Sequence, residues 1–202
     1  MTGVENERAF GRLAPAGYYI ALRVGFILPL AERNTMPQAW IDRYTRLGYL
    51  VHDPVIRWVY GNTGTIRWSA IDLPDPRGIL REAAEYGMRF GLAVCCSPAQ
   101  ETGQRSFATF ARSDREFADA EAQELQARVA ALHLAATPPK NLTRGEIEAL
   151  AMMREGLLLK EIAGRVGVTE GAIKQRLRSA KGKLNAKTAS KAVSCAAGYG
   201  LI

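Results

Sequence analysis

The sequence has few of the residues that build catalytic or metal centres. It contains two histidines, His52 and His133, and three cysteines, Cys95, Cys96 and Cys195. Their spacing matches neither a zinc-ligand set nor a nucleophile with its base, and there is no phosphate-binding glycine loop. We therefore expect no enzyme, cofactor or metal site. The two adjacent cysteines suit a buried strand with reduced thiols better than a disulfide.

Long apolar runs are also missing. The longest stretches, such as Val24–Leu30, are too short to cross a bilayer. The N-terminus has no charged start followed by an apolar run and a small-residue cleavage site. We expect a cytoplasmic protein that makes no membrane contact.

Lysine is absent from the first two-thirds of the chain. Residues 1–137 hold 15 Arg and 15 Asp plus Glu, so their formal charges cancel. Residues 138–202 hold all 7 Lys, 5 Arg and 5 Glu, and therefore carry the whole excess of +7. A basic third attached to a neutral two-thirds is typical of a nucleic-acid-binding module joined to another domain.

Two consecutive prolines mark the boundary between these parts. Pro138 and Pro139 cannot continue a helix and favour an extended linker. We predict an N-terminal domain of residues 1–136, a linker of residues 137–141 and a C-terminal domain of residues 142–202.

The N-terminal part alternates between strand-like and helix-like stretches. β-Branched and aromatic residues predict strands over 18–27, 90–96 and 105–111, the last two joined by a turn that contains glycine. Helical spacing predicts helices over 37–48, 54–59 and 77–88, and a long helix from Ser113 with Asp114, Glu116 and Asp119 in its first turns. This mixture predicts an α+β fold, with helices flanking a sheet.

The C-terminal part carries only helical signals. Thr143 and Glu146 form a capping box for a first helix, a short helix follows over 160–166, and Thr169 caps a third helix after the turn at Gly167. The inward face of the third helix consists of Ile173, Leu177, Ala180 and Leu184, and a basic face of Lys174, Arg178 and Lys181 with Gln175 and Arg176 beside it. This arrangement outlines a DNA recognition helix. The alternative is a surface helix whose basic side chains are only solvated.

These residues resemble the LuxR-type helix-turn-helix. The resemblance is carried by Leu142-Thr143, Glu146, Gly156, Glu161-Ile162-Ala163, Val168-Thr169-Glu170, Ile173-Lys174, Leu177, Lys183-Leu184 and Gly200-Leu201-Ile202. It implies an all-α four-helix domain whose third helix enters the major groove of double-stranded DNA. Gly171, Lys174 and Arg178 would then lie at bases or neighbouring phosphates, and Arg176 at a phosphate.

The resemblance also implies that the last helix, about residues 188–197, pairs two subunits. The predicted dimerisation residues are Ala189, Ala192, Val193 and Ala196. One departure from the family is the segment Leu157-Leu158-Leu159, where relatives often carry a hydroxyl-bearing residue. The second helix therefore loses a cap and a phosphate contact.

Four residues of the N-terminal part allow two interpretations. Taken alone, Trp40, Tyr44 and Trp68 are core aromatics and Asp53 caps the helix that begins at Pro54. Together with Gly91, however, they resemble the set that marks acyl-homoserine-lactone-binding domains of the LuxR type. The resemblance implies an α-β-α sandwich that senses a small acylated lactone.

The ligand roles follow from this resemblance and from the chemistry of the lactone. Asp53 would accept a hydrogen bond from the amide N–H of the ligand, and Trp40 would donate to the carbonyl of its ring. Tyr44 and Trp68 would form the wall, and Thr109 would lie near the amide or a 3-oxo group. Met36 stands where the family commonly has a tyrosine that donates to the amide carbonyl.

The hypothesis is a quorum-sensing transcription regulator controlled by a buried N-acyl-homoserine lactone. It would bind a near-palindromic operator as a homodimer. The alternative is a ligand-independent regulator of the same type, an orphan or antagonist that binds DNA or a related protein without sensing a lactone. Met36, the short N-terminus and the three leucines favour this alternative.

Overall fold

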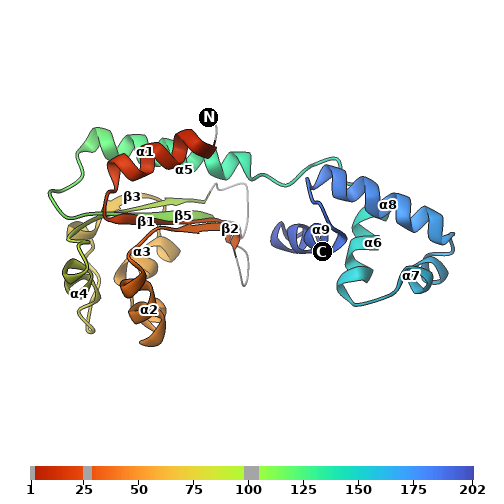
Figure 1. Ribbon diagram of the computed structural model, residues 1–202, viewed down its shortest axis with the longest axis horizontal. Coiled ribbons are helices and arrows are strands. Elements are labelled where there is room, and N and C mark those ends of the chain that lie inside the picture. The colour runs from red at the N-terminus through yellow and green to blue at the C-terminus, as the bar shows by residue number, and fades with distance from the viewer. Residues whose placement is uncertain (1–2, 25–28, 98–104) are drawn as a thin grey trace. The chain divides into compact units, whose positions relative to one another are not determined.

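The computed structural model describes residues 3–24, 29–97 and 105–202, which divide into two compact units (Figure 1). The described part of the first unit is residues 3–24, 31–97 and 105–135, and that of the second is residues 29–30 and 136–202. In these residues, the first unit is mixed helix and sheet and the second is helical, which confirms the predicted fold class.

The first unit is built on a five-stranded sheet in the order β2-β1-β5-β4-β3. The strands are β1 (Gly17–Val24), β2 (Pro29–Asn34), β3 (Gly64–Arg67), β4 (Phe90–Cys96) and β5 (Arg105–Arg112). β1 pairs with β5, β5 with β4, and β4 with β3, all antiparallel. The predicted strands correspond to β1, β4 and β5, whereas β2 and β3 were not predicted. Residues 25–27 and the predicted glycine turn lie outside the described residues.

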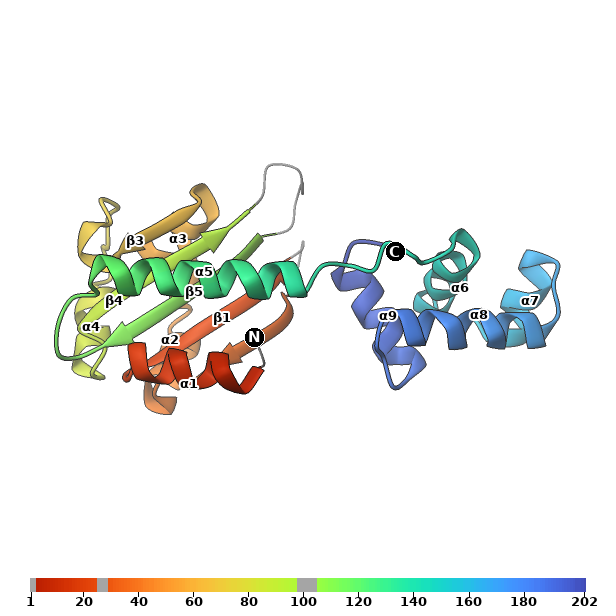
Figure 2. The ribbon, with the colours of Figure 1, turned by 90° about the horizontal axis from the view of Figure 1, so that it is seen from above.

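Helices cover both faces of the sheet (Figures 1 and 2). On one face lie α1 (Gly3–Leu13) and α5 (Asp119–Ala135), and on the other lie α2 (Gln38–Arg46), α3 (Pro54–Gly61) and α4 (Ile79–Glu85). Successive strand residues point to opposite faces. On β5, Phe107 therefore packs under α2–α4 while Phe110 packs under α1 and α5. The first unit is thus an α-β-α sandwich with one apolar core on each side of the sheet.

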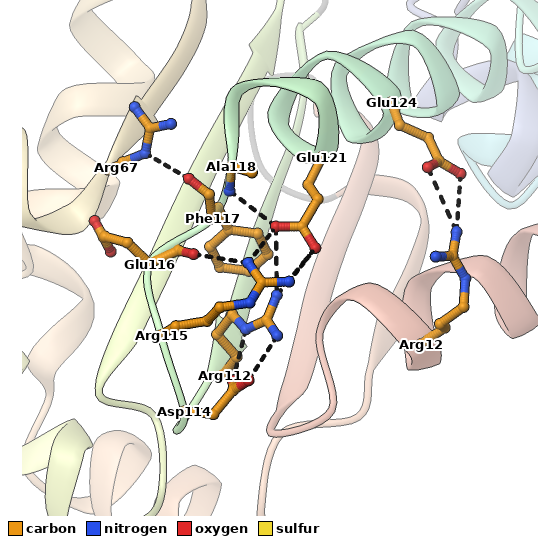
Figure 3. A network of polar contacts seen from close by, with 10 residues as sticks. All are labelled: Arg12, Arg67, Arg112, Asp114, Arg115, Glu116, Phe117, Ala118, Glu121 and Glu124. Atoms are coloured by element: carbon orange, nitrogen blue, oxygen red, sulfur yellow. Dashed lines mark hydrogen bonds and ion pairs between the residues drawn. The ribbon is translucent and has the colours of Figure 1, made fainter.

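The long helix α5 begins six residues later than predicted. Asp114 and Glu121 instead hold two arginines of the preceding segment (Figure 3). Asp114 accepts two hydrogen bonds from Arg112, at 2.7 and 2.8 Å, and Glu121 accepts two from Arg115, both at 2.8 Å. Glu121 also accepts the backbone N–H of Ala118 at 2.8 Å and so caps the true start of α5. The acidic cluster was predicted to stabilise a helix through its dipole, but part of it forms these ion pairs instead.

A buried polar network joins β1, β5 and the end of α5. Arg23 is 1% exposed and adopts a left-handed φ of 51°. Its guanidinium donates twice to the carbonyl oxygen of His133, at 3.2 and 2.9 Å. The hydroxyl of Ser106 accepts the backbone N–H of Arg23 at 2.9 Å and lies 2.8 Å from Nδ1 of His133. The last carbonyls of a helix have no partner within it, so Arg23 satisfies one at the end of α5.

The second unit contains α6 (Arg144–Arg154), α7 (Leu159–Val166), α8 (Glu170–Lys183) and α9 (Ala189–Gly198). The capping box of Thr143 and Glu146 and the cap at Thr169 are confirmed. No side chain caps α7 at Leu158, as expected from the leucine segment, but the carboxylate of Glu161 accepts the N–H of Leu158 at 2.7 Å. In the described part of the chain, no helix combines the length and apolar character needed to cross a membrane.

Candidate ligand site and DNA-binding surface

The carboxylate of Asp53 is held at the start of α3 under α2. Pro54 occupies the first helical position, so Asp53 is the N-cap and its Oδ1 accepts the N–H of Val55 at 2.7 Å. Its Oδ2 accepts the hydroxyl of Tyr44 at 2.8 Å. Asp53 therefore caps α3, as the first interpretation expected, and also accepts a hydrogen bond from an aromatic side chain of α2.

Asp53 is 8% exposed, and no cation among the described residues forms an ion pair with it. Burial raises the pKa of Asp53 above the ordinary value. The hydrogen bonds from Tyr44 and the α3 backbone lower the pKa, but they only partly offset the effect of burial. A carboxyl group whose pKa is raised by folding destabilises the folded protein when it ionises at neutral pH. A further hydrogen-bond donor would relieve this cost, and each carboxylate oxygen accepts more than one donor.

Trp40 lies on α2 at the centre of an aromatic cluster. Its ring centroid is 5.6 Å from that of Tyr44, 6.2 Å from Tyr49 and 5.4 Å from Tyr86. The side chain is 7% exposed. Among the described residues none accepts its indole N–H, so this donor is available to a ligand.

Trp68 is positioned by two residues of the sheet beneath it. Its indole N–H donates to the hydroxyl oxygen of Thr109 on β5 at 3.1 Å. A Cβ at Gly91 on β4 would lie closer than 3.0 Å to the indole atoms Cδ2, Cε2 and Cε3. The ring therefore occupies the place of a side chain at Gly91. The sequence identified Gly91 only as part of a family pattern, and this packing is its physical reason.

The six predicted ligand residues lie together on the side of the sheet covered by α2–α4. Met36, Trp40 and Trp68 belong to one buried cluster, and Tyr44 packs against it. Hydrogen bonds attach Asp53 to Tyr44 and Thr109 to Trp68. Several sheet residues on this face are small, namely Ala21, Gly91, Ala93 and Ala111. The structure thus brings these residues together, and their contact with a ligand stays a prediction.

The sequence did not indicate the ion pair and hydrogen bond that link α2 and the following turn to α4. The guanidinium of Arg43 pairs with Glu82, and the hydroxyl of Tyr49 donates to the same carboxylate at 2.6 Å. Hydrogen bonds from Tyr49 and then from Arg43 lower the pKa of Glu82. These residues are 33 to 39 positions apart in sequence, so no local pattern could reveal their contact.

A cavity of about 180 Å³ lies on the opposite face of the sheet and is lined by α1, β1, α5 and residues 31–33 of β2. Its apolar lining comes from Phe10, Tyr18, Ile20, Leu22 and Leu132. None of the six predicted ligand residues lines it. The cavity is therefore distinct from the candidate ligand site.

Helix α8 has one exposed polar face and one buried apolar face. Gly171, Lys174, Gln175 and Arg178 are exposed, whereas Ile173, Leu177 and Ala180 are buried in the core of the second unit. Within the described residues, neither Lys174 nor Arg178 forms an ion pair. Arg176 and Lys181 are half-buried, and the guanidinium of Arg176 lies against Gly145 of α6. The face has the composition and exposure that a DNA contact needs.

A buried ion pair holds α8 on α6. Nζ of Lys183 lies 2.8 and 2.9 Å from the two carboxylate oxygens of Glu146, whose side chain is 5% exposed. Burial alone would raise the pKa of Glu146, but hydrogen bonds from Lys183, Ser179 and the Thr143 backbone lower it to about 2. The capping residue of α6 therefore also fixes the recognition helix.

We expect Glu146→Gln to destabilise the protein at neutral pH by about 3 kcal/mol, because a depressed pKa measures the preference of the fold for the ionised form. This stabilisation is complete above the unfolded pKa near 4.5 and is lost as the pH falls toward about 2. Thermal unfolding from pH 7 to pH 2.5 should therefore show the melting temperatures of variant and wild type converging in acid. A difference independent of pH would contradict the ionic role of Glu146.

Two of the predicted dimerisation residues require correction. Ala192 and Ala196 are 0% exposed because they pack in the core of their own unit, so they cannot contact a second subunit directly. Ala189 and Val193 are half-buried. Pairing through α9 would also need the exposed residues Ser190, Lys191 and Ser194.

Comparisons with known proteins agree with both halves of the chain. Residues 29–137 match the autoinducer-binding domain family. Transcriptional activator protein RaiR of Rhizobium etli is 29% identical over 175 residues, covering 78% of this chain and 71% of RaiR. The quorum-sensing regulator RhlR of Pseudomonas aeruginosa is 23% identical over 200 residues, covering 92% of this chain and 82% of RhlR.

The fold is shared with SdiA of Escherichia coli. The crystal structure of SdiA aligns with a TM-score of 0.52 at 23% identity, over 98% of this chain and 89% of SdiA. The named relatives are transcription regulators and not enzymes. The chain belongs to the autoinducer-binding domain family of LuxR-type quorum-sensing transcription regulators.

Proposed function

We propose that the first unit binds an N-acyl-homoserine lactone between the sheet and α2–α4, and that binding controls the recognition of DNA by α8. The observation that carries this proposal is the buried carboxylate of Asp53, which has no cation partner among the described residues. Its need for a further donor is met by the amide N–H of such a ligand.

The remaining parts of the lactone suit the other residues of the site. The indole N–H of Trp40 donates to the carbonyl of the lactone ring, and the aromatic cluster around it encloses the ring. The acyl chain lies among the apolar side chains that α2–α4 share with the sheet, near Met36 and Trp68. A few placed polar groups in an apolar site are the usual design of a small-molecule pocket.

We propose further that the protein binds DNA as a homodimer. Two copies of α8 would then enter the major groove at half-sites about one helical turn apart, so the operator is near-palindromic. Lactone binding stabilises the folded sensor by mass action and thereby raises the amount of protein able to pair and bind.

The first test is thermal unfolding of the full chain with N-acyl-homoserine lactones from butanoyl to dodecanoyl. A saturating ligand at 100 times its Kd stabilises by about 2.7 kcal/mol, which corresponds to a rise in Tm of roughly 5–10 °C. Asp53→Asn should abolish most of this rise, because the amide side chain that replaces the carboxylate can keep the cap but binds the ligand N–H poorly. Without ligand its Tm should equal or exceed that of wild type, since a buried charge has been removed.

Asp75→Asn is the matched control. Asp75 precedes the N-cap Gly78 and accepts the N–H groups of Ile79 and Leu80 at the start of α4, at 2.9 and 3.0 Å. Its charge also contributes to the raised pKa of Asp53, so its variant removes a nearby charge without removing the Asp53 carboxylate. Its variant should keep the ligand-induced rise in Tm. If no lactone shifts the Tm of a folded wild type that binds DNA, the ligand-independent alternative is correct and the lactone proposal fails.

A further inference from the structure

The side chain of Tyr19 faces the candidate ligand site from the sheet. Tyr19 lies on β1 directly across the ladder from Thr109 on β5. Its ring centroid is 5.9 Å from that of Phe107, and the side chain packs against the cluster that contains Trp40. Ile20, the next residue, belongs to the core on the other face. Tyr19 is therefore a residue of the ligand side that no sequence pattern indicated.

The hydroxyl of Tyr19 donates a hydrogen bond that can be exchanged for one to a ligand. It donates to Oε2 of Glu32 at 2.9 Å. Glu32 lies on the edge strand β2 and is exposed, so water can replace the hydroxyl at small cost. Burial and the neighbouring Glu32 raise the pKa of Tyr19, which keeps the phenol protonated and able to donate.

A bound acyl amide brings a carbonyl oxygen that also needs a donor. Leaving such a group unsatisfied in an apolar site costs affinity. The hydroxyl of Tyr44 is used by Asp53, and the indole N–H of Trp68 is used by Thr109. The buried side chain of Met36 has no donor.

Of the hydroxyls near the site that are not donated to Asp53, those of Tyr19 and Thr109 lie on the sheet, whereas that of Tyr86 lies in the aromatic cluster around Trp40. The N–H and C=O of a trans amide point in opposite directions. A carbonyl partner therefore lies opposite Asp53, which is carried by α3, and the sheet beneath α3 carries Tyr19. Tyr19 and Tyr44, the partner of Asp53, both pack against the cluster that contains Trp40, so Tyr19 lies on the same side of the sheet as the group that would bind the amide N–H.

We propose that Tyr19 donates its hydroxyl hydrogen to the amide carbonyl of the lactone and exchanges Glu32 for the ligand as it does so. This inference rests on the proposed function. Tyr19 on β1 would then supply the hydrogen-bond donor that the side chain of Met36 lacks. Glu32 would compete with the ligand for the hydroxyl of Tyr19. Substitutions at the two positions should therefore change affinity in opposite directions.

The experiment measures the Kd of the full chain for the panel lactone that wild type binds most tightly. Tyr19→Phe keeps the ring and should weaken binding by about tenfold, the value of one neutral hydrogen bond. Glu32→Ala frees the hydroxyl and should tighten binding. The thioamide counterpart of the same lactone, whose sulfur is a weaker acceptor, should show a smaller loss with Tyr19→Phe. The Tm of each variant without ligand checks folding.

Three results would overturn the inference. Equal losses in Tyr19→Phe and Glu32→Ala would mean that the pair only supports the fold. Unchanged affinity in Tyr19→Phe would show that the carbonyl has another partner, and a carbonyl-dependent loss in Thr109→Val would identify it. Failure of wild type to bind any panel lactone would instead overturn the proposed function itself, and this inference with it.

Discussion

Gly91→Ala is expected to lower the melting temperature by roughly 6–12 °C and to abolish lactone binding. The new methyl group would overlap the indole of Trp68, so the ring must leave its place and lose its hydrogen bond to Thr109. Overpacking of this kind costs about 1–3 kcal/mol, and the lost hydrogen bond adds about 1 kcal/mol. Thermal unfolding and ligand titration of the full chain measure the two effects.

A control and a rescue make this prediction specific. Gly61, the last residue of α3, has open space where a methyl group would project, so Gly61→Ala should change the melting temperature little. Trp68→Phe removes part of the ring that the new methyl group meets. The double variant Gly91→Ala with Trp68→Phe should therefore melt above Gly91→Ala alone. A Gly91→Ala protein as stable as wild type would refute the packing argument.

The double variant Lys174→Ala with Arg178→Ala is expected to weaken DNA binding at least about 100-fold. Both side chains are exposed on α8 without an ion pair among the described residues, so their removal should not disturb the fold. If both contact phosphates in each subunit of the dimer, the slope of log affinity against log salt should also fall by about 4. Binding is measured on double-stranded DNA selected by wild type from a random pool.

The control removes the same charge from segments outside α8. Lys140→Ala with Lys187→Ala eliminates two exposed lysines that precede α6 and α9. This variant should bind the selected DNA within a fewfold of wild type if α8 is the contact. Equal losses in the two double variants would show that only net charge matters and that the basic face of α8 is merely solvated.

The elements that could be predicted from the sequence are those with local signals. Capping by Thr143, Thr169 and Asp53 depends on residues two or three positions away, and all three caps are present. Strands β4 and β5 are apolar, central and buried, so composition sufficed. These features depend on residues that are close together in the sequence, so they can be predicted without the tertiary structure.

The missed elements depend on tertiary contacts. β2 is an edge strand with four exposed residues in a row, so it has no alternating pattern. β3 has four half-buried residues and is defined by its pairing with β4. The start of α5 was misplaced because the ion pairs of Arg112 and Arg115 could not be foreseen from acidic residues alone.

The candidate site was predicted as a set of residues but not as an arrangement. Trp40, Tyr44 and Asp53 were expected in one site. The hydrogen bond from Tyr44 to Asp53 and the packing of the Trp68 ring against Gly91 could be seen only in the structure. Ala192 and Ala196 of α9 were predicted at a subunit interface for a related reason. Small side chains suit both a helix-helix contact within one unit and a subunit interface, and only burial distinguishes the two.

The network of Arg23, Ser106 and His133 determines where hybrid regulators can be joined. The guanidinium of Arg23 donates a hydrogen bond to the His133 carbonyl, and the hydroxyl of Ser106 is hydrogen-bonded to the His133 imidazole. The end of α5 is therefore an integral part of the first unit. A recombination point before His133 would import a foreign side chain into this buried cluster. Exchange of DNA-binding modules should therefore be made after Ala135, within residues 136–141, where the sensor keeps every residue of the network.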